Sequence, residues 1–450
     1  MNTFCLALVF LSLLGGAALL RRAHDRRSAA PLAAALSGAA LLGALGFAAA
    51  GVWPARAAAG SPPDLLASLL LGAVTVSLFG MSLGAPRSEL EGDRLASAFA
   101  LAAVFAAACF AHGTRWLGVV VAVSAVPLVP RGRAVILPLI GSASMAAGLF
   151  WLAQAGEATL PIAGDAPSGA LALVWIGAWM RIGLVPFHGW VPVLFERSHP
   201  AKSLLAFVAN PGTVVLIRVC LGTRWMHGEA GHLFTALAAF SALYGAFLCL
   251  GQRDLLRAVG FQALASSGLV VTGLCSRETA GVAGAIVHLA ASSLFLTGLT
   301  LVAWGVRARF GGAPGVAVQG VAQRARHASA AFLLFGLAAA GFPGTLCFVS
   351  EDLLLHGVIE HRPVVGTVMV LTTALSAVAM LRLFFIVFLG PPSGSGAPAG
   401  LAREVVPDLF PREKAAFGLL LAVLVGLGVS PGLAVRAAEI SASMATSGPH

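Results

Sequence analysis

A proline-interrupted apolar segment, Trp179 to Pro192, contains the first side chains that could handle a charge. Arg181 precedes Pro186, and His188 follows that proline by two residues. An arginine stays protonated and acts as a fixed counter-charge, whereas a histidine can exchange a proton near neutral pH. A break in a membrane helix is tolerated only where protein or water satisfies the freed backbone. The segment is therefore a candidate ion-handling site. The structural alternative for His188 is a hydrogen-bonded residue that only holds a helix end.

A second interrupted segment places a carboxylate after its break. Pro343 and Gly344 interrupt the apolar run, and Glu351 follows them. A carboxylate in this position is a candidate proton carrier, and the alternative is an acid at the membrane surface. That alternative suits Asp352 better than Glu351. Because paired interrupted helices mark the ion site of many transporters, the two breaks together favour transport over packing as their explanation.

Other polar residues interrupt apolar stretches elsewhere. The triplet Asn210, Pro211 and Gly212 predicts a third break, and His288 lies inside a later apolar segment. For His288 we weigh a titrating residue against a hydrogen-bonded core histidine, and both interpretations stay open.

Composition restricts the class of protein. The chain is 58% hydrophobic and 10% charged, with a mean hydropathy of +0.92, whereas soluble domains carry about 25% charged residues. We expect one all-α integral membrane domain over residues 1–450. The net charge of +10 reflects arginines in short loops and does not indicate nucleic-acid binding.

The cysteines do not suggest a metal or cluster site. The six cysteines have no paired spacing, so we interpret them as small apolar residues. We expect no metal and no cofactor in this chain. Whether it forms part of an enzyme stays open, and any electron carrier would belong to another subunit.

Hydropathy predicts about fourteen crossings, since a spanning helix needs roughly 20 apolar residues. The expected spans are 3–20, 29–52, 64–85, 95–112, 115–130, 134–155, 168–195, 203–222, 231–250, 256–275, 281–305, 330–358, 364–389 and 415–437. Arg21 and Arg22 after the first span indicate a transmembrane helix and not a cleaved signal peptide.

The distribution of charged residues predicts the topology. Most Lys and Arg fall in loops after odd-numbered spans, which places these loops in the cytoplasm and both termini on the non-cytoplasmic side of the cell inner (plasma) membrane. The interrupted spans 168–195 and 330–358 are an odd number of crossings apart. Residues 95–222 and 231–390 are therefore expected to form inverted repeats, followed by a C-terminal transmembrane helix at 415–437.

Several blocks around these breaks carry a family resemblance. They read RIGLVPFHGWVPVLFERSHPAKS from Arg181, NPGTVVLIR from Asn210, RDLLRAVGFQALASSG from Arg253 and GFPGTLCFVSEDLLL from Gly341. From about residue 170 to 435 the chain resembles the antiporter-like membrane subunits of complex I (NADH:quinone oxidoreductase), the M-type most closely, and the related Mrp antiporters.

This resemblance implies a fold and an activity. It implies a fourteen-helix bundle with inverted five-helix repeats and interrupted seventh and twelfth helices. It also implies partners, namely other membrane subunits, the lipid bilayer, and protons or monovalent cations. A midplane line of lysines, glutamates and histidines would move protons in step with NADH/quinone-type electron transport.

The chain departs from that line at most positions. The family's glutamate falls at Ala122, its first lysine is Arg181, and its second lysine falls at Asn210. A further lysine or histidine falls near Leu296, and only the acid at Glu351 is kept.

These departures leave two hypotheses. In the first, a proton- or cation-translocating subunit uses a reduced relay through Glu351, His188 and His288. In the second, a non-conducting membrane scaffold anchors a partner, as in an inorganic-carbon uptake complex.

Overall fold

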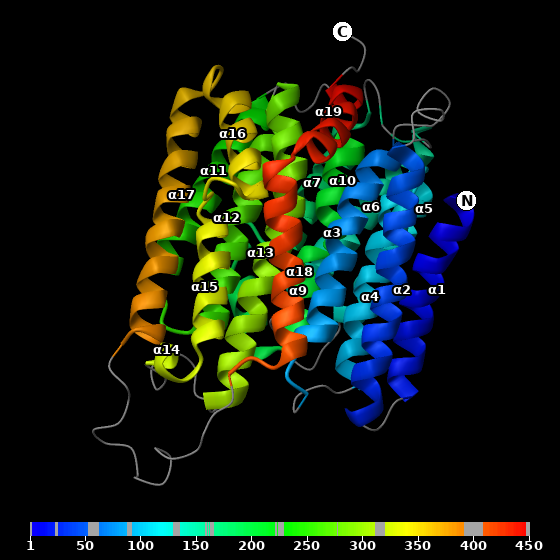
Figure 1. The fold of residues 1–450 in the computed structure, drawn as a ribbon. Coiled ribbons are helices and arrows are strands. Elements are labelled where there is room, and N and C mark those ends of the chain that lie inside the picture. Colours follow the sequence, from blue (N-terminus) through cyan, green and yellow to red (C-terminus); the bar gives the residue numbers. More distant parts are fainter. Residues whose placement is uncertain are drawn as a thin grey trace.

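The computed structural model describes most of the chain, and the described residues are almost entirely helical and contain no β-strand (Figure 1). They are residues 2–22, 26–52, 63–87, 92–128, 136–157, 160, 162, 166–220, 223, 229–276, 278–310, 320–390 and 408–446. The expected all-α membrane fold is confirmed.

The helices of the first half include short pieces around the breaks. They are α1 (Asn2–Arg22), α2 (Arg26–Val52), α3 (Pro63–Gly84), α4 (Gly92–Cys109), α5 (Thr114–Val123), α6 (Ile136–Gln154), α7 (Ser168–Ile182), α8 (Trp190–Arg197), α9 (Pro200–Val208) and α10 (Pro211–Val215), the last continued by a π-helical turn, Leu216–Cys220.

The second half contains the longest helix, α13. Its helices are α11 (Glu229–Leu250), α12 (Leu255–Leu274), α13 (Thr279–Phe310), α14 (Val321–Arg324), α15 (Arg326–Ala339), α16 (Leu346–Ile359), α17 (Pro363–Leu383), α18 (Pro411–Val429) and α19 (Gly432–Thr446).

The expected spans coincide with these helices. Among the described residues, ten helices are long and apolar enough to cross a membrane, or eleven if the bent pair α18 and α19 counts as one span. The three remaining expected spans contain the shorter apolar helices α5, α7 and α15. Two of these three, α7 and α15, are the first halves of the interrupted spans.

The last span differs from its prediction. Residues 415–437 were expected to form one helix, but α18 and α19 meet at 72°. Ser430 and Pro431 separate them. A proline disfavours helical backbone at the residue before it and donates no hydrogen bond, so the chain turns there.

The centre of the bundle is formed by α12 and α13, between α17 on one flank and α1 on the other (Figure 1). The membrane-length windows of α12 and α13 are each 94% buried, compared with 33% for α17 and 28% for α1. The outer helices present apolar side chains to their surroundings, as lipid-facing helices do. Polar residues on α12 and α13 therefore lie in the protein interior.

Candidate functional site

The first break is held open by side-chain hydrogen bonds to the backbone. After α7, Gly183 adopts a φ of +84°, in the left-handed region that favours glycine. The Met180 carbonyl accepts from Trp190 Nε1 at 3.1 Å, and the Val185 carbonyl accepts from Trp179 Nε1 at 2.8 Å. These indole donors satisfy carbonyls that the interrupted helix leaves free, which is the condition for breaking a helix inside a membrane.

Asn210 connects the third break to the first. Its Nδ2 donates to the Arg181 carbonyl at 2.9 Å, and its Oδ1 accepts from Gly212 N at 3.0 Å. Pro211 occupies the first turn of α10, where a missing N–H costs nothing. At this triplet the chain passes from α9 to α10, and Asn210 serves as a helix cap and an interhelical tie.

The Arg181 side chain is enclosed in the bundle. It is fully buried, and its Nε, Nη1 and Nη2 have no hydrogen-bond partner among the described residues. A buried guanidinium is costly without a counter-charge or solvent, so intramembrane arginines mark functional positions by default. Arg181 therefore lies buried in the last turn of α7, directly before the first break.

His188 lies on the exit side of the first break, around Pro186. Its ring meets Tyr244 of α11 edge-on, with centroids 5.2 Å apart and planes at 86°. The sequence analysis missed Tyr244, although it is the only tyrosine of the chain. His188 is partly exposed, unlike Arg181, so it lies between the interior and the surroundings of the bundle.

The second break has a similar backbone arrangement. Gly341 and Gly344 have φ values of +68° and +89°, and α16 begins two residues after Gly344, beyond Pro343. A Cβ at Gly341 would overlap Glu351 Oε2, so a glycine is required there by conformation and by contact. The Glu351 carboxylate therefore lies directly against the break.

The Glu351 carboxylate lines a cavity of about 370 Å³ between α16 and α17. Gly341, Asp352, Met369 and Thr373 are among the other lining residues. Glu351 Oε1 is buried and has no hydrogen-bond partner among the described residues. A partnerless carboxylate oxygen beside a cavity of this size can exchange a proton with water or with a neighbouring group.

His288 reaches the same region from α13. Its Nδ1 lies 2.9 Å from Ser350 Oγ, and Ser350 Oγ donates its single hydrogen to the Cys347 carbonyl at 2.7 Å. The contact therefore requires the proton on Nδ1, which leaves Nε2 as the acceptor. Nε2 is buried and has no partner among the described residues. Through this contact between the packed helices α13 and α16, His288 reaches Ser350, the residue directly before Glu351.

A small internal cavity joins two of the positions at which the chain departs from the family pattern. Its volume of about 10 Å³ is close to that of one water molecule. It is lined by Phe207, Val208, Asn210, Thr213, Ser267, Val270, Leu289, Ser292, Ser293 and Leu296. The hydroxyl groups here were missed from the sequence, although the serines belong to two Ser-Ser pairs in apolar segments, 266–267 and 292–293, which could have drawn attention to them.

Four of the five candidate ion-handling residues fall into two groups, and His188, whose ring faces Tyr244, belongs to neither. Arg181 and Asn210 form one, and His288 and Glu351 form the other, with no hydrogen bond between the groups among the described residues. Ala122 is exposed on α5 and belongs to neither. Within the described part of the chain, no group of three His, Cys, Asp or Glu could hold a metal ion. The five cysteines whose side chains are described are free and buried.

Comparison with known proteins decides the family. Residues 133–376, more than half of the chain, match the transmembrane family of NADH:quinone oxidoreductases and Mrp antiporters. The chain belongs to this family. The match spans both interrupted helices and every candidate residue except Ala122.

Curated relatives include NADH-quinone oxidoreductase subunit M of Mycobacterium tuberculosis, 28% identical over 60% of this chain and 49% of the relative. Subunit N of Desulforudis audaxviator is 30% identical over 60% of this chain and 56% of the relative. The chain spans about half the length of the curated relatives it matches.

Solved structures share the fold over almost the whole chain. A chain of respiratory complex I from Thermus thermophilus has a TM-score of 0.84 and 23% identity, covering 98% of this chain and 99% of that chain. A chain of the Mrp complex from Dietzia has a TM-score of 0.82 and 17% identity, covering 99% and 98%.

Proposed function

We propose that this protein is an antiporter-like membrane subunit of a complex I-like or Mrp-like assembly, taking part in proton or cation translocation coupled to NADH/quinone-type electron transport. The observation that carries this proposal is the position of Glu351. Its carboxylate lies against an interrupted helix, lines a cavity and keeps one oxygen without a partner among the described residues. Among the candidate residues, this acid matches the family pattern directly.

The pathway that the geometry supports is a reduced relay. The relay uses Glu351, His288 and His188. Glu351 and His288 carry the proton in the second half, where the tautomer of His288 leaves Nε2 free to accept, and His188 carries it beside the first break. The small cavity between Asn210 and Leu296 provides a position for one water in place of the family's basic side chains. Arg181 acts as a fixed charge that raises the energy of a cation near the first break.

The two interrupted spans support the proposal of inverted repeats over 95–222 and 231–390. Each first half, α7 or α15, is followed closely by a left-handed glycine. Each restarts as a short helix after a proline, at Trp190 or Leu346. Interrupted helices in corresponding positions are the arrangement of repeat-built transporters.

The distribution of arginines supports the proposed orientation in the plasma membrane. Arg21 and Arg22 end α1, and Arg307 and Arg309 lie in the last turn of α13. Both helix ends point to the lower side of the bundle in Figure 1, while the C-terminal helix α19 lies at its upper side. The positive-inside rule assigns the lower side to the cytoplasm and both termini to the opposite side.

The partners we propose are other membrane subunits of a multi-subunit complex. The solved structures similar in fold come from respiratory complex I, an Mrp complex and a membrane-bound sulfane sulfur reductase. The curated relatives are named as quinone oxidoreductase subunits. These names favour a translocating subunit over the scaffold of an inorganic-carbon uptake complex.

The test combines co-purification with a proton-transport assay. We expect the tagged protein from its native host to bring down quinone-reductase, hydrogenase or antiporter subunits. In membrane vesicles, Glu351→Gln should lower proton translocation at least tenfold, because the amide keeps the shape and cannot release a proton.

The matched control is Glu360→Gln, which makes the same chemical change at an exposed acid at the end of α16 that does not line the cavity. It should leave translocation within twofold of wild type. Normal translocation by the Glu351→Gln protein would refute the relay. Recovery of a carbonic-anhydrase-like partner alone would refute the respiratory assignment.

A further inference from the structure

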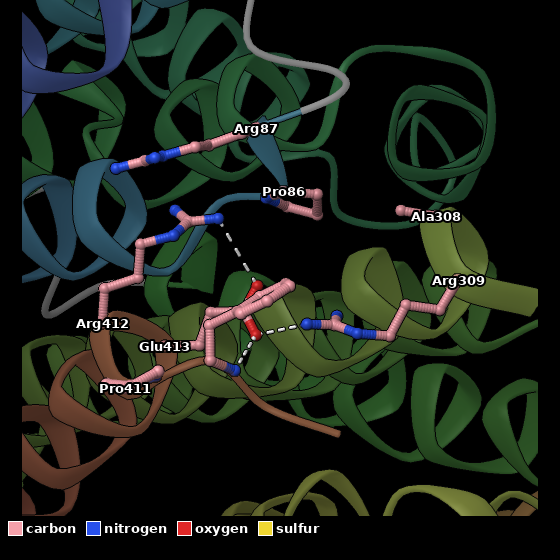
Figure 2. Close-up of a pocket in the computed structure, with 8 residues that line it drawn as sticks. Pro86, Arg87, Ala308, Arg309, Pro411, Arg412 and Glu413 are labelled. Carbon is pink, nitrogen blue, oxygen red and sulfur yellow. Dashed lines mark hydrogen bonds and ion pairs between the residues drawn. The ribbon is translucent and has the colours of Figure 1, made fainter. Parts of the chain in front are cut away.

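A basic pocket lies apart from the candidate ion site, where the end of α3, the end of α13 and the start of α18 meet (Figure 2). Its volume is about 540 Å³. The lining residues are Pro86, Arg87, Ala308, Arg309, Phe410, Pro411, Arg412 and Glu413. They come from segments far apart in the sequence, so only the folded bundle creates this pocket.

Backbone contacts fix one arginine of the pocket. Arg412 Nη1 donates to the Leu83 carbonyl at 2.9 Å and to the Ala85 carbonyl at 2.7 Å, at the end of α3. Carbonyls at a helix end have no partner within the helix, so a guanidinium there caps α3 and ties it to α18. Arg412 is therefore held at the pocket by the fold itself.

Glu413 fixes a second arginine. Its Oε2 accepts from Phe410 N at 2.9 Å, which caps the start of α18, and also from Arg309. Arg412 Nη2 lies 3.6 Å from Glu413 Oε1, too far for a hydrogen bond. In Figure 2, Arg309 and Arg412 approach Glu413 from different sides, and Arg87 lies beyond Arg412.

The pocket carries excess positive charge. Three guanidinium groups and a single carboxylate line it, which leaves two positive charges uncompensated by the lining residues. Arg87 is exposed, and the carboxylate of Glu413 is already occupied by Arg309 and the Phe410 N–H. Guanidinium groups match the oxygens of a phosphate in geometry and charge, so the pocket suits a phosphate group.

The walls of the pocket distinguish a lipid from a free phosphate. Pro86, Ala308, Phe410 and Pro411 are apolar, and Phe410 is 46% exposed. The pocket lies at the ends of membrane helices, on the arginine-rich side, where headgroups meet the protein. We propose that it binds the phosphate of an anionic phospholipid, with the apolar walls contacting the glycerol region of that lipid.

Native mass spectrometry of the purified full chain tests this proposal, using phosphatidylglycerol and phosphatidylcholine with identical acyl chains. The wild-type protein should retain phosphatidylglycerol at least fivefold better than phosphatidylcholine. Arg87→Ala should lower phosphatidylglycerol retention about fivefold, which corresponds to about 1 kcal/mol for one arginine near a membrane surface. Arg87 is exposed at a helix end, so this variant should unfold at the wild-type temperature.

Arg324→Ala is the matched control, because it removes the same charge from an exposed position outside the pocket, at the end of α14 on the same lower side of the bundle (Figure 1). It should change retention less than twofold. Equal retention of the two lipids, or equal losses in the two variants, would overturn the proposal. If an equal concentration of inorganic phosphate displaces phosphatidylglycerol, the pocket binds free phosphate, and the lipid proposal is overturned. All these outcomes are independent of whether the protein transports ions.

Discussion

Replacing Asn210 by alanine tests whether this residue holds the interrupted helices together. The Arg181 carbonyl lies in the last turn of α7, and its ordinary helical donor, Val185 N–H, donates instead to Ser241 Oγ at 3.1 Å. Asn210 Nδ2 therefore replaces that donor at 2.9 Å, while Oδ1 caps α10 at 3.0 Å. Asn210→Ala removes both bonds at once.

The expected loss can be worked from these two bonds. Removing a helix cap costs about 0.5–2 kcal/mol, and leaving a buried carbonyl without a partner costs about 1–3 kcal/mol. We expect Asn210→Ala to lower the free energy of unfolding by the sum of these two losses, about 1.5–5 kcal/mol. Asn210→Ser keeps an acceptor for Gly212 N–H but is too short to reach the Arg181 carbonyl, so it should lose only the carbonyl contribution of about 1–3 kcal/mol.

The assay is equilibrium unfolding by sodium dodecyl sulfate in maltoside micelles, followed by far-ultraviolet circular dichroism. Ser144→Ala is the control, because Ser144 Oγ donates at 2.9 Å to the Leu173 carbonyl, which lies mid-helix and has its own backbone donor. Its loss should stay below about 1 kcal/mol. If the free energy of unfolding of Asn210→Ala lies within about 0.5 kcal/mol of wild type, which is the smallest cap effect alone, the reasoning is refuted.

Three further predictions concern stability, and the first two use the same unfolding assay. Arg181→Met should keep or raise stability, because it removes a buried cation without a partner among the described residues; a loss above about 1 kcal/mol would contradict this. Arg218→Met should instead lose about 2–3 kcal/mol, because Arg218 donates to the Cys109 and Ala111 carbonyls. Burial raises the pKa of Asp408, but hydrogen bonds from the His327 backbone and ring and from a neighbouring backbone N–H outweigh it and lower that pKa overall. The ionised Asp408 therefore stabilises the folded protein above its unfolded pKa of about 3.9, and this stabilisation is lost as pH falls through the lower folded pKa. The thermal unfolding temperature should fall when the pH is lowered from 6 to roughly 3, because Asp408 becomes protonated. In Asp408→Asn this contribution to the fall should be absent.

The sequence by itself determined the class of protein, most of the spans and three of the helix breaks, whereas the bend between α18 and α19 was missed. Long apolar runs can only be membrane helices, and Pro186, Asn210-Pro211-Gly212 and Pro343 interrupt helices through local backbone chemistry. The identity of Glu351 as the candidate acid also followed from its place after a break. These features depend on residues close together in the chain, so no knowledge of helix neighbours was needed.

Only the tertiary structure decided which polar groups meet. It joined Asn210 to the Arg181 carbonyl and His288 to Ser350, and it assembled three arginines from distant helix ends into one pocket. Hydropathy does not predict such contacts, because lipid-facing and protein-facing sides of a membrane helix are both apolar. Neighbours in a bilayer are instead chosen by close packing and by the need to satisfy each buried polar group, and both depend on the whole bundle.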